Sequence, residues 1–114
     1  MTNSKQKLVI VLRKDLGMSP GKLIAQAIHA ASRTGKIMQY DEGNEPFCIV
    51  CYVKKEKDLI TLGEKAAIAG IPFGLQIDAG HTEVEKGTLT VLAIGPDDEE
   101  KVSAITKGLQ LFKG

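Results

Sequence analysis

The chain has 114 residues, of which 43 % are hydrophobic and 25 % charged, and this composition suits one soluble domain with a buried core. No apolar run is long enough to cross a membrane, and the polar N-terminus lacks the apolar segment of a signal peptide. We therefore expect a cytoplasmic protein with no membrane partner. The net charge is +1, but seven of the 15 basic residues lie within the first 40 positions, which could give a phosphate-binding face or a scatter of solvated lysines.

The N-terminal part of the chain predicts a strand followed by a helix. Residues 1–6 are expected to form a flexible N-terminus. The continuous apolar run at 8–12 is typical of a strand that is buried on both faces. A helix is expected over residues 20–33, because Ser19 suits the N-cap and Pro20 suits the first helical position.

The remaining elements alternate in type along the chain. They are expected as a strand over 47–53, a helix over 56–69, strands over 73–77 and 88–94, and a helix from 97 to about 107 or 111. Gly95-Pro96 is expected to end the fourth strand. The order β-α-β-α-β-β-α predicts one three-layer α/β/α domain over residues 7–114. Its four-stranded sheet should be mixed, because no helix separates the last two strands.

Cys48 and Cys51 form a Cys-x-x-Cys within the expected strand at 47–53. Residues three apart on a strand point to opposite faces, so the two thiols should share neither a disulfide nor a metal ion. A redox motif of this spacing needs a helix N-terminus, and a zinc site would need further ligands. We interpret both cysteines as small packing residues, and we expect no metal and no cofactor.

Lys22, Gln26 and His29 share one face of the expected first helix, because they are spaced at i, i+4 and i+7. The helix dipole disfavours a lysine in the first turn, so another group could stabilise it there. Alternatively, Lys22 extends into solvent, and Gln26 and His29 are surface residues. The core side of this helix is expected to consist of apolar residues, namely Leu23, Ile24, Ala27, Ile28 and Ala31.

Asp78 directly follows the expected strand at 73–77 and begins a polar connection. Ligands of open α/β sheets gather outside the carboxyl ends of strands, and the loop that leads to Lys22 meets the same condition. Asp78 could orient a water or take a proton there, while Lys22 could stabilise an oxyanion or a phosphate. Asp78 could equally cap its own loop. The residues that would converge on this cleft are Lys22, Gln26, His29, Asp78, His81 and Thr82.

Motifs of several other enzyme classes do not fit the sequence. The stretch from Gly17 to Lys22 is one residue short of a P-loop, and Leu23 stands where Ser or Thr would hold magnesium. No G-x-G-x-x-G follows the first strand, and no His-Glu-x-x-His occurs. A nucleotide-binding P-loop and a dinucleotide-binding fold therefore receive no support.

Taken together, these residues resemble the type 2 peptidyl-tRNA hydrolases of archaea and eukaryotes. The resemblance extends in order over about residues 7–112 and is carried by residues 8–16, Gly21-Lys22, Gln26, His29-Ala-Ala31, Asp78-Ala-Gly80, Thr82 and residues 87–96. It implies a mixed sheet flanked by helices. It also implies hydrolysis, without a metal, of the ester that joins a peptide to the 3′ ribose of tRNA. Peptidyl-tRNA would be the substrate, and members of the family often form homodimers.

The resemblance also implies roles for individual residues. The positions tied to activity are Lys22, His29, Asp78 and Thr82, with Gln26 beside them. Asp78 or His29 would handle the proton of the attacking water, and Lys22 and Thr82 would stabilise the oxyanion or the terminal nucleotide. Basic side chains would contact phosphates of the tRNA, and these are Arg13, Lys14 and Arg33.

The sequence departs from the family pattern after Asp78. His81 is expected to contact the substrate where the family usually has Arg, and a histidine is mostly neutral at pH 7. Glu83 and Glu85 add two acids beside the expected site. Two alternatives therefore stay open. One is a relative that binds a nucleotide, an RNA end or a protein without hydrolysis, and the other is a small hydrolase of another acyl ester.

Overall fold

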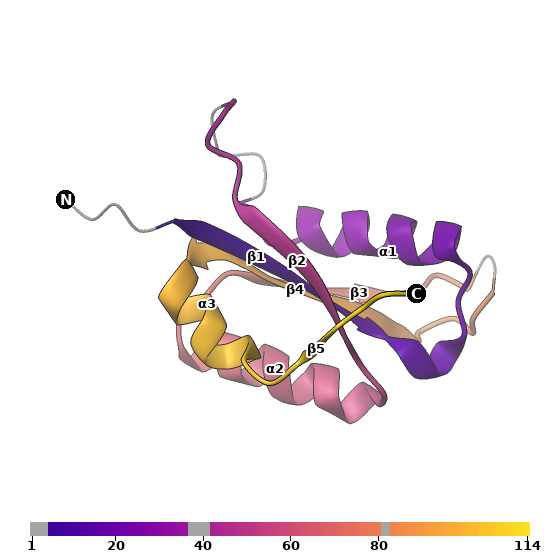
Figure 1. Ribbon diagram of the computed structural model, residues 1–114. Coiled ribbons are helices and arrows are strands. Elements are labelled where there is room, and N and C mark those ends of the chain that lie inside the picture. The colour runs from indigo at the N-terminus through magenta and orange to yellow at the C-terminus, as the bar shows by residue number, and fades with distance from the viewer. Residues whose placement is uncertain (1–4, 37–41, 81–82) are drawn as a thin grey trace.

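A sheet of five strands runs through the middle of the molecule, with helices on both of its faces (Figure 1). The computed structural model describes residues 5–36, 42–80 and 83–114. The strands are β1 (Gln6–Arg13), β2 (Phe47–Val53), β3 (Phe73–Ile77), β4 (Leu89–Asp98) and β5 (Gln110–Leu111). The helices are α1 (Pro20–Ser32), α2 (Glu56–Ile68) and α3 (Glu99–Thr106), and a short 3-10 helix, η1 (Lys14–Leu16), follows β1. Within these described ranges, no helix has the length and apolar character that a membrane span requires.

Strand direction brings the ends of three strands to one edge of the sheet. The strands lie in the order β3-β4-β1-β2-β5. β2 runs parallel to β1, whereas β4 runs antiparallel to both β1 and β3. The mixed sheet is therefore confirmed. Because β1, β2 and β3 point the same way, they end at one edge of the sheet, which we call the carboxyl edge.

The sheet has one strand more than the four that the sequence predicts. The chain returns to the sheet after α3 and adds β5 beside β2, with Cys51 paired to Leu111 and Tyr52 paired to Gln110. The predicted four-stranded sheet is thus wrong on this point. A two-residue strand is too short to leave a hydrophobic pattern, and α3, which ends at Thr106, is shorter than its longest predicted extent.

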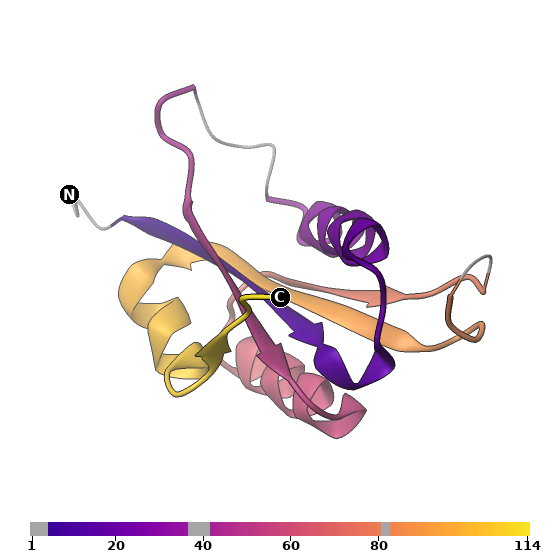
Figure 2. The ribbon, with the colours of Figure 1, turned by 45° about the vertical axis from the view of Figure 1, so that its right-hand side comes forward.

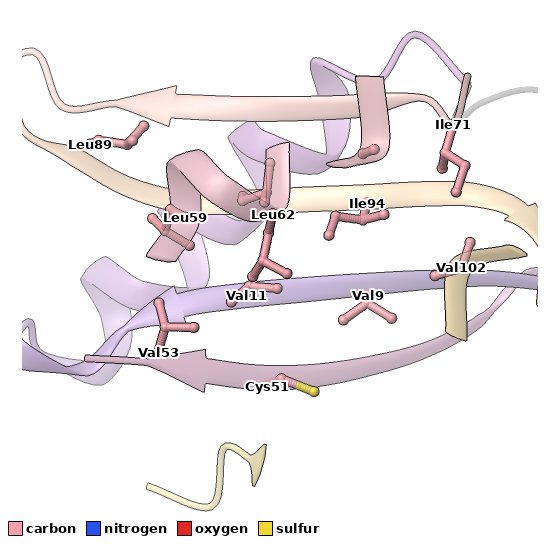
Figure 3. Close-up of a cluster of buried hydrophobic side chains, with 12 residues drawn as sticks. Val9, Val11, Cys51, Val53, Leu59, Leu62, Ile71, Leu89, Ile94 and Val102 are labelled. Atoms are coloured by element: carbon pink, nitrogen blue, oxygen red, sulfur yellow. The ribbon is translucent and has the colours of Figure 1, made fainter. Parts of the chain in front are cut away.

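Helices cover both faces of the sheet and enclose two hydrophobic clusters (Figures 1 and 2). α1 lies on one face, and α2 and α3 lie on the other. Figure 3 shows the larger cluster, in which Val9 and Val11 of β1 lie near Leu59 and Leu62 of α2. The smaller cluster, on the α1 side, consists of Leu8, Ile10, Leu12, Ala30, Val91 and Ala93. Side chains of β1 alternate between the two clusters, which confirms the prediction of a strand buried on both faces.

The buried face of α1 differs from the predicted one. Gln26 and Ala30 are buried, whereas Ile24 and Ile28 are 61 % and 60 % exposed. The prediction that Ile24 and Ile28 face the core is therefore wrong. The helix turns its Lys22 and Gln26 side toward the sheet, because polar groups at the ends of β3 and on β4 satisfy these two side chains.

β4 continues past Gly95-Pro96, where the sequence predicts that it ends. The strand reaches Asp98, and its pairing with β1 shifts register beside Lys7. Gly95 has a φ of 104°, and a Cβ there would lie 2.4 Å from the carbonyl oxygen of Lys7. Glycine thus allows the two backbones to pass closely, and the irregularity is absorbed within the strand. The third helix consequently begins at Glu99 and not at residue 97.

The other predicted elements agree with the structure within a few residues. β1 begins at Gln6, α1 ends at Ser32 and α2 ends at Ile68. Gln6, which is predicted to belong to the flexible N-terminus over residues 1–6, lies in β1. Residues 1–4 lie outside the described residues, and their flexibility stays a prediction.

The two cysteines of β2 have different environments. Cys51 is 2 % exposed and packs in the larger cluster, as predicted, and burial raises the pKa of its thiol. Cys48 is exposed, so the interpretation of this cysteine as a packing residue is wrong. Both thiols are free, which agrees with the prediction that they share no disulfide.

α1 crosses β3 so closely that the strand needs a glycine at position 74. A Cβ on Gly74 would lie 2.3 Å from the carbonyl oxygen of Ala30 and 2.8 Å from the Cβ of Arg33. We expect Gly74→Ala to lower the free energy of unfolding by about 1–3 kcal/mol, because α1 must move away from the sheet. Chemical denaturation of the variant and the wild type measures this difference.

Gly21→Ala is the matched control for this substitution. Gly21 lies in the first turn of α1, and a Cβ there meets no described atom within 4 Å. We expect the control to leave the free energy of unfolding unchanged or to raise it by up to about 1 kcal/mol. Equal losses in the two variants would show that the close crossing of α1 and β3 does not limit stability.

Candidate active site

Lys22 and Asp78 form an ion pair at the carboxyl edge of the sheet. Lys22 lies in the first turn of α1, and Asp78 is the residue that follows β3. The Asp78 side chain is only 1 % exposed, and a carboxylate buried so deeply needs an opposite charge and hydrogen-bond donors. The pair also explains how the first turn holds a lysine that the helix dipole disfavours. The two segments that the sequence analysis expects to converge are therefore in contact.

Backbone hydrogen bonds hold Asp78 in position. One carboxylate oxygen, Oδ1, accepts a bond of 2.6 Å from the N–H of Gly80, and the other, Oδ2, faces Lys22. The N–H of Asp78 donates to the carbonyl of Thr88, and its carbonyl accepts from the N–H of Gly87, both at 2.8 Å. Asp78 thus caps its own loop and binds the lysine at the same time. The loop cap that the sequence leaves open as one alternative is therefore observed, and the role of Asp78 toward a water stays a prediction.

Gln26 lies one helical turn after Lys22 and belongs to a buried polar network. Its Oε1 accepts a bond of 2.6 Å from the hydroxyl of Thr90, which lies 3.2 Å from the carbonyl oxygen of Gln76. The side-chain oxygen of Gln76 accepts from Nε of Arg33 at 2.8 Å. These bonds join α1 to β3 and β4. They fix the rotation of α1 that the ion pair requires.

Of the other predicted catalytic residues, the structure describes only His29, which lies away from the ion pair. His29 is exposed and lies about 10 Å farther along the axis of α1 than Lys22, given the rise of the helix. His81 and Thr82 lie outside the described residues, so their roles stay predictions.

Arg13 and Lys14 stand side by side at the carboxyl edge, but their side chains differ in environment. Arg13 is buried, and its guanidinium binds the carboxylate of Asp15 and the carbonyl of Leu89. The hydrogen bonds to Asp15 hold the pKa of Arg13 above its ordinary value. Lys14 is exposed, and its Nζ lies 4.7 Å from the centre of the Tyr52 ring. Arg13 therefore joins η1 to the start of β4, whereas Lys14 is accessible at the surface.

Sequence reasoning missed a contact between Glu83 and the N-terminus of α1. The Glu83 carboxylate accepts bonds from the N–H of Ser19, at 2.7 Å, and from its hydroxyl. The same hydroxyl oxygen accepts from the N–H of Lys22 at 3.3 Å. The hydrogen bonds from Ser19 hold the pKa of Glu83 below its ordinary value, and the Lys22 ammonium acts in the same direction. No local sequence pattern could have paired residues so far apart in the chain.

Ser19 also stands in a Gly17-x-Ser19-x-Gly21 pattern, which is the spacing of a hydrolase nucleophile elbow. Its backbone, however, has the ordinary extended angles φ −63° and ψ 157°, and its hydroxyl binds Glu83 and the N–H of Lys22. A nucleophile elbow holds its serine in a strained turn with the hydroxyl exposed. The geometry therefore assigns Ser19 to helix capping, as the sequence predicts.

The Glu83 contact should make the stability of the protein depend on pH. The folded state lowers the pKa of Glu83, so the stabilisation is complete above the ordinary value of 4.5 and is lost as the pH falls through the folded pKa. We expect Glu83→Gln to lower Tm at neutral pH and to match the wild type in acid well below that value. Thermal denaturation at both pH values, with Glu85→Gln as the control in the same loop, tests this. A Tm difference that stays the same in acid would contradict it.

The site offers an ammonium that is fixed beside a buried carboxylate. An ammonium can stabilise the negative charge that develops on a carbonyl oxygen, and a carboxylate can orient that ammonium and a water molecule. Across the three described ranges, no group of three or more His, Cys, Asp or Glu side chains gathers as a metal site would. Attack of water on a carbonyl carbon is one reaction that such a pair can assist.

Comparisons with known proteins agree with this chemistry. The family model described as "Peptidyl-tRNA hydrolase PTH2" matches residues 6–112. A protein of Methanocaldococcus jannaschii named peptidyl-tRNA hydrolase is 42 % identical, over 93 % of this chain and 99 % of the relative. A protein of the same name from Haloquadratum walsbyi is 41 % identical with the same coverage. A solved structure of a protein of unknown function from Agrobacterium covers 99 % of this chain and 100 % of its own, with a TM-score of 0.63 at 17 % identity, and supports the fold alone.

Proposed function

Because the chain belongs to the peptidyl-tRNA hydrolase PTH2 family, we propose that it hydrolyses peptidyl-tRNA at the Lys22–Asp78 pair. The bond that breaks is the ester between the peptide and the 3′ ribose of the tRNA. We place the reaction there because a buried carboxylate and a lysine form an ion pair at the carboxyl edge. Buried carboxylates with a specific charged partner are frequent in active sites, and this pair lies at the edge where ligands of such sheets bind.

In the proposed reaction, water attacks the carbonyl carbon of the ester. The electron pair of the C=O bond moves onto oxygen, and the Lys22 ammonium stabilises this oxyanion. The C=O bond then re-forms as the bond to the ribose oxygen breaks. The ribose oxygen takes the proton that the base removed from the water, and the peptide leaves with a free carboxyl group. Thr82 is a second proposed donor to the oxyanion.

The proton of the water goes to Asp78 or to His29 in this proposal. Asp78 already accepts hydrogen bonds from Gly80 and pairs with Lys22, and both contacts make a carboxylate a weaker base. His29 is exposed and lies about 10 Å farther along α1 than Lys22, so a proton would reach it through intervening water. We therefore propose that Asp78 orients Lys22 and the attacking water, and that the proton passes to His29 through water.

The tRNA backbone would lie along the basic surface near the site. Lys14 is exposed, and Arg33 uses Nε to bind Gln76 while its side chain remains at the surface, so both are proposed phosphate contacts. His81 is proposed to touch the terminal nucleotide. Arg13 is buried against Asp15, and its proposed contribution is to hold the loop that carries Lys14.

Three further proposals follow from membership of the family. We propose the cytoplasm as the compartment, because translation there supplies the substrate. The protein would work without a metal ion, and a homodimer remains a prediction that analytical ultracentrifugation can test. The two alternatives, a binding protein without activity and a hydrolase of another acyl ester, are separated by the experiment below.

Release of peptide from purified peptidyl-tRNA, with and without a chelator, tests the proposed function. We expect release that the chelator does not slow, and much slower release from a simple aminoacyl ester that lacks the tRNA. Binding of the tRNA without release would favour the inactive relative. Equal rates on the simple ester would favour the general hydrolase.

A further inference from the structure

A hollow of about 550 Å³ opens beside the end of β2. It is lined by two lysines, an aromatic ring, an amide and the end of the chain, namely Lys14, Tyr52, Gln110, Leu111, Lys113 and Gly114. None of these side chains is acidic. The hollow therefore offers positive charge next to an aromatic ring, and this combination is typical of sites that bind single-stranded nucleic acid.

The Tyr52 ring is held by a hydrogen bond, and Lys14 lies over it. The Tyr52 hydroxyl donates to the side-chain oxygen of Gln110, its partner on β5. The Nζ of Lys14, an exposed residue, lies 4.7 Å from the centre of the half-buried Tyr52 ring, and a cation–π contact at the surface is weak. Lys14 can thus exchange the ring for a phosphate oxygen, which leaves the anchored ring available to a base.

The hollow and the ion pair lie along the same edge of the sheet. Lys14 follows β1, Tyr52 is next to the end of β2, and Asp78 follows β3, so all three stand at the carboxyl edge. β4 and β1 lie between β3 and β2, which makes three strand spacings, or about 14 Å. A short single strand of RNA that has its end at the ion pair can reach the hollow along this edge.

We propose that the hollow binds one nucleotide of the single-stranded 3′ end of tRNA, with the phosphate against Lys14 and Lys113 and the base against Tyr52. The inference rests on the proposed function, because it takes the ester at Lys22 and Asp78 as the end of the strand. Stacking on an aromatic ring tolerates any base, and lysines bind phosphate without reading sequence. A site of this kind suits an enzyme whose substrates share a 3′ end and differ in the rest of the tRNA.

Binding of a labelled RNA hairpin that carries a single-stranded 3′ end, and no peptide, tests the inference. We expect Tyr52→Leu to weaken binding about tenfold, because the base loses its stacking surface. Tyr52→Phe is the matched control, since it removes the hydroxyl and keeps the ring, and we expect less than about a twofold change. The same hairpin with its 3′ end trimmed to a blunt end should bind the wild type and both variants equally.

The salt dependence of binding tests the two lysines separately. We expect Lys14→Gln and Lys113→Gln each to reduce the slope of log affinity against log salt concentration by about one, because each variant loses one phosphate contact. Lys65→Gln is the control, because Lys65 is exposed on α2, on the other face of the sheet. Its slope should equal that of the wild type. If Tyr52→Leu does not fold, Lys14→Gln and Lys113→Gln still test the inference.

Two results would overturn the inference. One is tight binding of the single-stranded end by folded Tyr52→Leu together with unchanged salt slopes. The other is a loss of affinity on Tyr52→Leu that is as large for the blunt hairpin as for the hairpin with a single-stranded 3′ end. That result would mean that the hollow binds duplex RNA. Peptide release by the wild type, measured in parallel, distinguishes this failure from failure of the proposed function. If the wild type releases peptide but Tyr52 does not affect RNA binding, the hollow is not a nucleotide site. If RNA binding depends on Tyr52 but no peptide is released, the proposed hydrolase function is wrong.

Discussion

Asp78→Asn is expected to slow peptide release in a single turnover by about 10²- to 10⁴-fold, while the protein stays folded. The amide has the shape of the carboxylate and can still accept the N–H of Gly80. It has no charge with which to hold the Lys22 ammonium, so the group that would stabilise the oxyanion loses its fixed position. Single-turnover rates at saturating enzyme measure the chemical step directly.

Asp97→Asn is the control for the loss of charge at Asp78. Asp97 pairs with Lys101 at 3.5 Å, but this pair lies near the end of β4, at the opposite edge of the sheet from the carboxyl edge. We expect the control to release peptide at the wild-type rate. A wild-type rate in Asp78→Asn, from a protein with a native circular dichroism spectrum, would remove Asp78 from the mechanism.

Lys22→Met is expected to affect both the reaction and the fold. The rate of peptide release should fall by about 10²- to 10³-fold, because the oxyanion loses its ammonium. The free energy of unfolding should fall by about 3 kcal/mol, because the substitution leaves the Asp78 carboxylate buried without its opposite charge. Single-turnover kinetics and chemical denaturation measure the two losses on the same sample.

Two comparisons separate these effects of Lys22→Met. Addition of Asp78→Asn should restore much of the stability, since no buried charge then remains, and should restore none of the rate. Lys101→Met, which breaks the exposed pair with Asp97, should change stability by less than about 1 kcal/mol. A Lys22→Met protein as stable as the wild type would show that Asp78 does not depend on the lysine.

The sequence predicts the order of the elements and the convergence of Lys22 with Asp78 because both depend on local signals. The apolar run at 8–12, the N-cap Ser19 and the acid at the end of a strand are each visible within a few residues. The rule that ligands gather at the carboxyl ends of strands then connects segments that are far apart in the chain. These signals predict the convergence of the two segments, whereas the direct contact between Lys22 and Asp78 is seen only in the structure.

Features that depend on distant partners could not be predicted in this way. The rotation of α1 buries Gln26 and exposes Ile24, and this choice depends on the hydroxyl of Thr90, which lies 64 residues from Gln26. A hydrophobic pattern alone favours the opposite rotation. The Glu83 contact with Ser19 spans the same distance in the chain. Each of these is a polar contact in tertiary structure, and the sequence leaves no local trace of it.

The most direct test of the account is a double-mutant cycle on the rate of peptide release from peptidyl-tRNA. The four proteins are the wild type, Asp78→Asn, Lys22→Met and the double variant, all measured in a single turnover with a chelator present. If the ion pair acts as one catalytic unit, the double variant should be no slower than the slower single variant. Rate losses that multiply in the double variant would contradict the account, because they would mean that the two residues act independently.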